Sequence, residues 1–233
     1  MGVKSWLKDF VSLIFPDVCE VCDTTLVHGE KTLCLHCFAD IPRTNLHNQV
    51  FSEIHKRLAG HTPICKAASF FYYYKENAYA RMIQSAKYNN RPMLAYNLAV
   101  MFGREIKPDG FFDGIDVILP VPLHWFKELR RGYNQSEEIA KGLSEVSGIP
   151  VCDNLVAIRS HATQTRRGSF ERWMNTRDIF SVEDPEELED KHILIVDDVI
   201  TTGATLLSCA DAIHAVVPTA TISIASLGFT RSN

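Results

Sequence analysis

The chain alternates between short apolar runs and longer segments in which apolar residues recur every three or four positions. The apolar runs have the length and composition of strands, and the repeating segments have the spacing of amphipathic helices. Strands that alternate with helices are typical of an α/β fold with a doubly wound, mainly parallel sheet. The pattern predicts strands over residues 66–74, 117–122, 155–158, 193–196 and 221–227, and helices over residues 79–88, 93–106 and 205–216, with a further helix ending at residue 146.

Composition and charge limit the classes of protein that fit. The chain has 233 residues, of which 46% are hydrophobic, enough for one α/β domain and a small additional module. Its net charge of −4 argues against a uniformly basic nucleic-acid-binding protein. No apolar run approaches the roughly 18 residues of a transmembrane helix. Neither G-x-G-x-x-G nor G-x-x-x-x-G-K-[ST] occurs, which argues against a dinucleotide site and a P-loop NTPase.

The N-terminal segment over residues 6–15 is apolar but not continuously so. Lys8 and Asp9 interrupt it, and no cleavage site of small residues follows, so a signal peptide is disfavoured. The segment predicts a short amphipathic helix that packs on the protein, and contact with a membrane surface is the alternative. Without an export signal, we expect a cytoplasmic location and mostly reduced cysteines.

Four of the seven cysteines form two C-x2-C pairs, and two such pairs can surround one tetrahedral Zn²⁺. With four thiolates no coordination position is open, so the zinc would be structural. Two disulfides or a thiol redox pair are the alternatives. The stretch over residues 42–62 is polar and is expected to be irregular, which predicts a boundary between an N-terminal helix and zinc module (residues 1–60) and an α/β domain (residues 61–233). The expected zinc ligands are Cys19, Cys22, Cys34 and Cys37, whereas Cys65, Cys152 and Cys209 are predicted to be small buried hydrophobic residues.

The run over residues 193–205 places a buried strand directly before two acidic residues and a hydroxyl-rich turn. Asp197 and Asp198 follow Val196, where the strand should end, at the carboxyl edge of the sheet where ligands bind. The turn from Thr201 to Thr205 offers hydroxyls, backbone N–H groups and a helix N-terminus, which together suit a phosphate. The sequence therefore predicts a site for a phosphorylated sugar. The alternative is an acidic turn and a capped helix without a ligand.

This run closely resembles the motif of type I phosphoribosyltransferases that binds 5-phosphoribosyl 1-pyrophosphate (PRPP). The resemblance implies that Asp197 and Asp198 act as the catalytic pair on the ribose 2- and 3-hydroxyls, and that Mg²⁺ binds with PRPP. It also implies that the turn holds the 5-phosphate and that the loop at residues 121–123 meets pyrophosphate. The expected substrate-binding residues are Val199, Thr201, Thr202, Gly203, Ala204, Thr205, Val121, Pro122, Leu123, Arg131 and Arg172.

The two arginines in this set depend on loops. Arg131 follows the strand over residues 117–122, and the alternative for it is a solvated loop cation. Arg172 belongs to a basic stretch over residues 159–177 of the kind that closes over an anionic ligand. The alternative for this stretch is a mobile basic loop.

The whole arrangement resembles the ComF family, which includes the GntX-type proteins. Four segments carry the resemblance: the four cysteines, residues 119–122 with 131–135, residues 163–175, and the PRPP motif. It implies a cytoplasmic protein linked to DNA uptake in natural competence, with pentosyl transfer from PRPP to an unknown acceptor. The alternative is a non-enzymatic competence factor that binds single-stranded DNA or partner proteins, with the PRPP site as sensor or relic.

Overall fold

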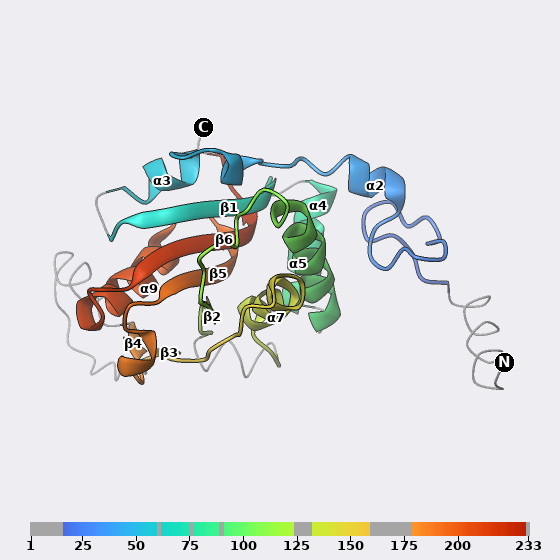
Figure 1. Ribbon diagram of the computed structural model, residues 1–233. Helices are drawn as coiled ribbons and strands as arrows, with labels where there is room; N and C mark the ends of the chain where they lie inside the picture. Colours follow the sequence, from blue (N-terminus) through green and yellow to red (C-terminus); the bar gives the residue numbers. More distant parts are fainter. Residues whose placement is uncertain are drawn as a thin grey trace, which may run out of the picture.

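The computed structural model describes residues 16–59, 62–74, 77–88, 91–123, 132–158 and 179–231. Its main sheet has four strands, all parallel, in the order β1-β6-β5-β2 (Figure 1). The predicted parallel sheet is confirmed. The strands are β1 (Ile64–Tyr72), β2 (Val117–Pro120), β5 (His192–Ile200) and β6 (Thr221–Phe229).

Helices cover both faces of this sheet (Figure 1). Along β5, Leu194 and Val196 belong to one core, whereas Ile193 and Ile195 belong to the other. This alternation follows from the period of two in a strand and confirms that the strand is buried on both faces. The first core contains α4 (Ala78–Tyr88), α5 (Pro92–Ile106) and α7 (Gln135–Ser147), and the second contains α9 (Ala204–Val216) and α3 (Glu53–Arg57).

The packing of α5 on α7 depends on a glycine. A Cβ atom at Gly142 would lie 2.6 Å from the carbonyl oxygen of Tyr96 and 2.7 Å from Cβ of Ala99. Both distances are shorter than van der Waals contact, so only glycine lets the two helices approach this closely. The position of α7, whose first turn points to the carboxyl edge of the sheet, is therefore fixed by close helix packing.

A second, small sheet stands beside the main one. It pairs β3 (Leu155–Ala157) with β4 (Phe180–Val182) in antiparallel fashion, and a short 3₁₀ helix, η2 (Glu186–Leu188), follows. The strand predicted over residues 155–158 exists, but it does not join the parallel sheet. Phe180 and Leu155 are buried against the core that contains α9.

The segment before β1 is ordered and packed, which differs from the irregular stretch predicted over residues 42–62. It contains the 3₁₀ helix η1 (Leu46–Asn48) and α3, with Leu46, Ile54 and Leu58 fully buried. Its backbone also pairs with β1, since the N–H of Thr44 donates to the oxygen of Phe70. The division at residue 60 stays a prediction, and these contacts favour a division nearer to residue 40.

Among the described residues, a further helix is α2 (Leu35–Ala39), which lies within the four-cysteine region. The amphipathic helix predicted over residues 6–15 falls outside the described residues. Within the described part of the chain, no helix is both long and apolar enough to cross a membrane.

Candidate functional site

A cavity of about 620 Å³ opens at the carboxyl edge of the parallel sheet. It brings together the ends of β2 and β5 with the first turns of α7 and α9, and the small sheet forms a further wall. Such an edge is where open α/β sheets bind ligands. The cavity is lined by Val121, Pro122, Leu123, Asn134, Gln135, Ser136, Ala157, Ile179, Phe180, Asp197, Asp198, Val199, Thr201, Ala204, Thr205 and Ser208.

The two acids lie within β5, and the prediction that the strand ends before them was wrong. Asp197 pairs with Ser226 of β6, and the pairing continues to Ile200. On the other side, β2 pairs only as far as Val196, after which Val121 donates one more backbone hydrogen bond to it. Because β2 leaves the sheet there, β5 projects beyond its neighbour and exposes both carboxylates to the cavity.

The carboxylate of Asp197 is held in place by two donors. Its Oδ1 accepts a 3.2 Å hydrogen bond from the Ser136 hydroxyl and a 2.8 Å hydrogen bond from the backbone N–H of Asp198. Ser136 stands in the first turn of α7, whose positive end therefore faces the acidic pair. This arrangement fixes the direction of the Asp197 side chain.

Asn134 joins the loop after β2 to the same helix. Its Oδ1 accepts from the N–H of Ser136, which caps α7, and its Nδ2 donates to the oxygen of Val121, both at 3.0 Å. Asn134 and Ser136 were not predicted as site residues from the sequence. A signal was present, because Asn134 three residues before Glu137 is a helix-start pattern.

The predicted phosphate turn leads directly into α9. Thr201, Ala204 and Thr205 line the cavity. The turn is held by a 3.3 Å hydrogen bond from the N–H of Ala204 to Oγ1 of Thr202. Gly203 is the N-cap residue with φ +83°, a left-handed conformation that glycine adopts without strain. Thr202 and Gly203 are not among the lining residues; Thr202 is exposed, and Gly203 is buried.

Arg57 supports this turn from α3. Its guanidinium donates a 2.7 Å hydrogen bond to the carbonyl oxygen of Thr201 and lies 4.2 Å from the centroid of the Phe229 ring. Burial lowers the pKa of Arg57 from its usual value. Arg57 was not predicted from the sequence, because it lies in the stretch that was expected to be irregular.

The remaining sequence predictions concern two arginines and three cysteines. Arg131 and Arg172 lie outside the described residues. Cys209 is fully buried, as predicted, and burial followed by the charge of Asp197 raises the pKa of its thiol well above the usual value. Cys209 is therefore protonated and unsuited to act as a nucleophile. Cys152 is only half-buried, and Cys65 is exposed on β1, so the prediction that it is buried was wrong.

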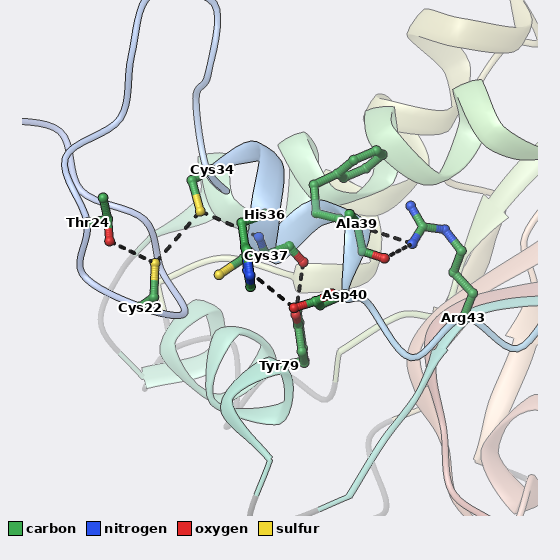
Figure 2. A network of polar contacts seen from close by, with 10 residues as sticks. Cys22, Thr24, Cys34, His36, Cys37, Ala39, Asp40, Arg43 and Tyr79 are labelled. Carbon is green, nitrogen blue, oxygen red and sulfur yellow. Dashed lines mark hydrogen bonds and ion pairs between the residues drawn. The ribbon is translucent and has the colours of Figure 1, made fainter.

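The four predicted zinc ligands come together near the N-terminus. All four sulfur atoms lie within 4.8 Å of one another, and those of Cys22 and Cys34 are 3.7 Å apart. A tetrahedral site with Zn–S bonds of about 2.3 Å places its sulfurs about 3.8 Å apart, so the cluster fits zinc. All four are free cysteines. Figure 2 shows His36 turned to Asp40, with 3.2 Å between Nδ1 and Oδ2.

The chemistry of these thiols also fits a metal. Hydrogen bonding to Thr24 lowers the pKa of Cys22 to about 6, whereas burial raises the pKa of Cys37. A buried thiol of raised pKa is deprotonated readily only beside a cation, which a bound metal supplies.

The module is joined to the α/β domain by polar contacts. The hydroxyl of Tyr79 on α4 donates to the carbonyl oxygen of Cys37 at 2.8 Å, and burial raises the pKa of Tyr79 to about 12 (Figure 2). Arg43 donates to the oxygens of Phe38 and Ala39 and pairs with Glu105 of α5 at 2.7 Å. These contacts fix α2 beside α4 and α5.

The model of the phosphoribosyl transferase domain family matches residues 115–231, half of the chain. Every residue that lines the cavity lies in that range.

Three relatives with curated names are similar to this chain. Competence protein F of Haemophilus influenzae is 40% identical over 94 residues, which are 39% of this chain and 41% of that protein. DNA utilization protein YhgH of Salmonella typhimurium is 30% identical over 133 residues, 55% of this chain and 58% of that protein. The chain thus spans about half the length of these two relatives. The protein of that name from Escherichia coli K12 is 28% identical over 198 residues, 83% of this chain and 82% of that protein.

Among solved structures, glutamine PRPP amidotransferase from B. subtilis, complexed with ADP and GMP, is similar with a TM-score of 0.39. The two share 22% sequence identity, and the similarity covers 56% of this chain and 25% of the other.

Proposed function

Because the chain belongs to the phosphoribosyl transferase domain family, we propose that it binds PRPP, or another ribose 5-phosphate, with Mg²⁺ at Asp197 and Asp198. One observation carries the proposal. Two carboxylates, the loop after β2 and the turn before α9 surround a single cavity at the carboxyl edge of the sheet. A phosphorylated sugar needs acceptors for its hydroxyls and an N–H-rich turn for its phosphate.

Each part of the cavity has a proposed role. Asp197 and Asp198 accept hydrogen bonds from the ribose 2- and 3-hydroxyls. The turn before α9 binds the 5-phosphate, with the positive end of the helix macrodipole behind it. The loop at residues 121–123 meets the pyrophosphate, and Arg131 and Arg172 would add positive charge there. Val199 and the residues of the turn complete the substrate-binding set.

The donor set fits Mg²⁺ only together with the substrate. Mg²⁺ prefers oxygen ligands and is commonly held by one or two carboxylates plus phosphates. Asp197 and Asp198 supply the carboxylates, and no third His, Cys, Asp or Glu ligand joins them in the described part of the chain. When bound, the ion would neutralise charge on the pyrophosphate.

The proposed reaction is phosphoribosyl transfer. The acceptor's lone pair forms a bond to the anomeric carbon of the ribose. The bond from that carbon to the pyrophosphate oxygen breaks, and pyrophosphate leaves with the electron pair. The acidic pair stabilises positive charge that develops on the ribose ring, and backbone N–H groups stabilise the leaving group. The acceptor is unknown, and no residue is assigned as its general base.

Calorimetry with PRPP and Mg²⁺ tests the binding step directly. We expect saturable binding to the intact chain and a loss of at least about tenfold in affinity for Asp197→Asn/Asp198→Asn, because hydrogen bonds to charged groups contribute strongly. Asp153→Asn, at an exposed position outside the cavity, is the matched control. Equal affinity in all three proteins would contradict the proposed site. Pyrophosphate release with bases, amines and nucleotides as acceptors then tests transfer.

A second candidate function rests on the names of the relatives, Competence protein F and DNA utilization protein YhgH. In this proposal the chain takes part in DNA uptake by binding single-stranded DNA or competence proteins, and the PRPP site is a sensor or a relic. If DNA is bound through phosphates, the affinity for single strands should fall steeply as the salt concentration rises. No binding at low salt would exclude direct contact with DNA.

We further propose that Cys19, Cys22, Cys34 and Cys37 hold one structural Zn²⁺. The spacing of their sulfurs supports this assignment. A closed set of four thiolates leaves no position for a substrate.

A further inference from the structure

A second cavity, of about 710 Å³, lies between the four-cysteine region and the outer face of α5. It shares no lining residue with the cavity at Asp197. Its volume is in the range of small-molecule sites, about 300–1,000 Å³. The lining residues are Gly29, Glu30, Lys31, Leu33, Leu35, Phe38, Arg43, Met93, Tyr96, Asn97, Val100, Met101, Arg104, Glu105 and Glu145.

The walls of this cavity combine apolar side chains with charged ones. Seven of the lining residues follow one stripe of α5 at helical spacing, from Met93 to Glu105. Met93 is 58% exposed on this stripe, and Leu35 on the opposite wall is 74% exposed. Adjustable methionine side chains are common where a protein surface accepts an apolar partner. The inner face of α5 is covered by the core, and α7 packs closely beside Tyr96 and Val100. Met93 and Arg104 are the exposed ends of the stripe toward the cavity.

The acidic groups of the cavity are already engaged. Both carboxylate oxygens of Glu30 accept backbone N–H groups, at 2.8 Å from Val27 and 2.7 Å from Leu35. Glu105 pairs with Arg43 at 2.7 Å. Glu145 accepts the hydroxyl of Tyr96, which raises the pKa of that tyrosine.

The cavity is also lined by two exposed cations, Lys31 and Arg104. Neither forms an ion pair with a carboxylate in the described ranges of the chain. Lys31 belongs to the four-cysteine region and Arg104 to the last turn of α5. The lining carries equal numbers of cationic and acidic residues, but the acids already accept hydrogen bonds or pair with Arg43, so Lys31 and Arg104 supply the free charged donors of the cavity, one from each side.

We propose that this cavity is a binding site for an amphiphilic anion, a small molecule with an apolar or aromatic body and one carboxylate, sulfonate or phosphate group. The body would displace water from Leu35, Phe38, Met93 and Met101, and the anion would lie between Lys31 and Arg104. The apolar side chains suit the body, and the free N–H donors of Lys31 and Arg104 suit an anionic group better than a neutral or cationic one. The site is separate from the proposed PRPP site and does not depend on it.

Fluorescence titration of the full chain with 8-anilinonaphthalene-1-sulfonate, an aromatic sulfonate, tests the site. We expect saturable binding, and an increase of about tenfold in the dissociation constant for Lys31→Glu/Arg104→Glu, equivalent to losing about 1.4 kcal/mol. The matched control is Lys191→Glu, which reverses an exposed lysine outside the cavity and should leave the constant unchanged. Leu35→Asn should weaken binding through the apolar wall. Circular dichroism and thermal unfolding verify that each variant is folded.

Competition identifies the chemistry of the ligand. Dodecanoate should displace the probe, and dodecanol, which has the same chain without the charge, should displace it much less. Equal displacement by both, or unchanged probe affinity in the charge-reversal variant, would overturn the proposal. The oligomeric state provides an independent outcome. Self-association that Lys31→Glu/Arg104→Glu abolishes would assign the cavity to a second copy of the chain instead.

Discussion

The hydroxyl of Ser136 donates a 3.2 Å hydrogen bond to Oδ1 of Asp197 and so joins α7 to the acidic pair on β5. These residues are 61 positions apart in the chain. The same helix turn is tied to the loop after β2 through Asn134. The acids, the predicted pyrophosphate loop and the first turn of α7 therefore form one hydrogen-bonded unit.

Removing the Ser136 hydroxyl should weaken PRPP binding without unfolding the protein. In Ser136→Ala, the carboxylate of Asp197 loses the hydroxyl donor, while the Asn134 cap of α7 remains. A hydrogen bond to a charged group contributes about 1.5–3 kcal/mol. We therefore expect calorimetry to show a loss of about tenfold in the affinity for PRPP. The control is Ser144→Ala, which removes a hydroxyl bonded to Ile149 near the far end of the same helix. Equal losses in the two variants would mean that the effect reflects helix stability.

Loss of one cysteine of the cluster should abolish zinc binding. Elemental analysis of the purified chain should find about one zinc ion per molecule, as expected for a closed site of four thiolates. Cys34→Ser should lose the metal and unfold at a lower temperature, because the module is held to α4 and α5 through groups such as the Cys37 carbonyl. Cys65→Ser, which removes the exposed thiol on β1, should retain zinc. Zinc retained in Cys34→Ser would contradict the assignment.

His192 should make the protein less stable in mild acid. Burial, reinforced by Lys66, lowers the pKa of His192, whose Nε2 lies 2.7 Å from the Ser223 hydroxyl. The unfolded chain protonates this residue near pH 6.5, above the pKa in the folded protein. Because the unfolded state then binds more protons, the free energy of unfolding falls as the pH drops below about 6.5.

Urea denaturation between about pH 7 and pH 5 measures this effect. His192→Gln can keep a hydrogen bond to Ser223 but cannot be protonated, so its stability should decline less over this range. His28→Gln, at an exposed position, controls for the removal of a histidine. If the stability of His192→Gln declined as steeply as that of the unmodified chain, groups other than His192 would cause the acid sensitivity.

The central strand of the sheet could be predicted because a continuous apolar run indicates burial on both faces. Ile193 to Val196 is apolar at every position, and each of its side chains lies in one of the two cores. The prediction that β5 ends at Val196 was wrong, because strand pairing continues with β6 on one side only. An apolar pattern in the sequence indicates which residues are buried. It does not indicate that polar residues can remain in a strand when they hydrogen-bond to only one neighbouring strand.

The parts that the sequence did not predict depend on contacts between distant segments. Leu46, Ile54 and Leu58 are spread through a polar stretch, and only the structure shows them covering β1 and the phosphate turn. The Ser136–Asp197 bond has no local signature. The second cavity arises where the four-cysteine region meets α5, and neither segment forms it alone.

Gly203 fixes the predicted phosphate turn, and its replacement should be costly for two separate reasons. Its φ of +83° is a left-handed conformation, and a Cβ atom there would lie 2.3 Å from Cδ2 of Leu58. Gly148, the C-cap of α7, has nearly the same φ of +82° with nothing within 4 Å of the added Cβ. We expect Gly148→Ala to cost about 1 kcal/mol from backbone strain alone, and Gly203→Ala about 2–4 kcal/mol because the contact with Leu58 adds to it.

Urea denaturation of a double-mutant cycle separates the two costs. Leu58→Ala removes the atom that the new Cβ would meet, so Gly203→Ala should cost less in that background, with a coupling of about 1 kcal/mol or more. PRPP affinity should also fall in Gly203→Ala, since the turn must shift where Thr201 and Ala204 line the cavity. Gly148→Ala should bind PRPP normally. Equal destabilisation by the two glycine substitutions would show that the Leu58 side chain moves aside at little cost and that α3 does not stabilise the turn.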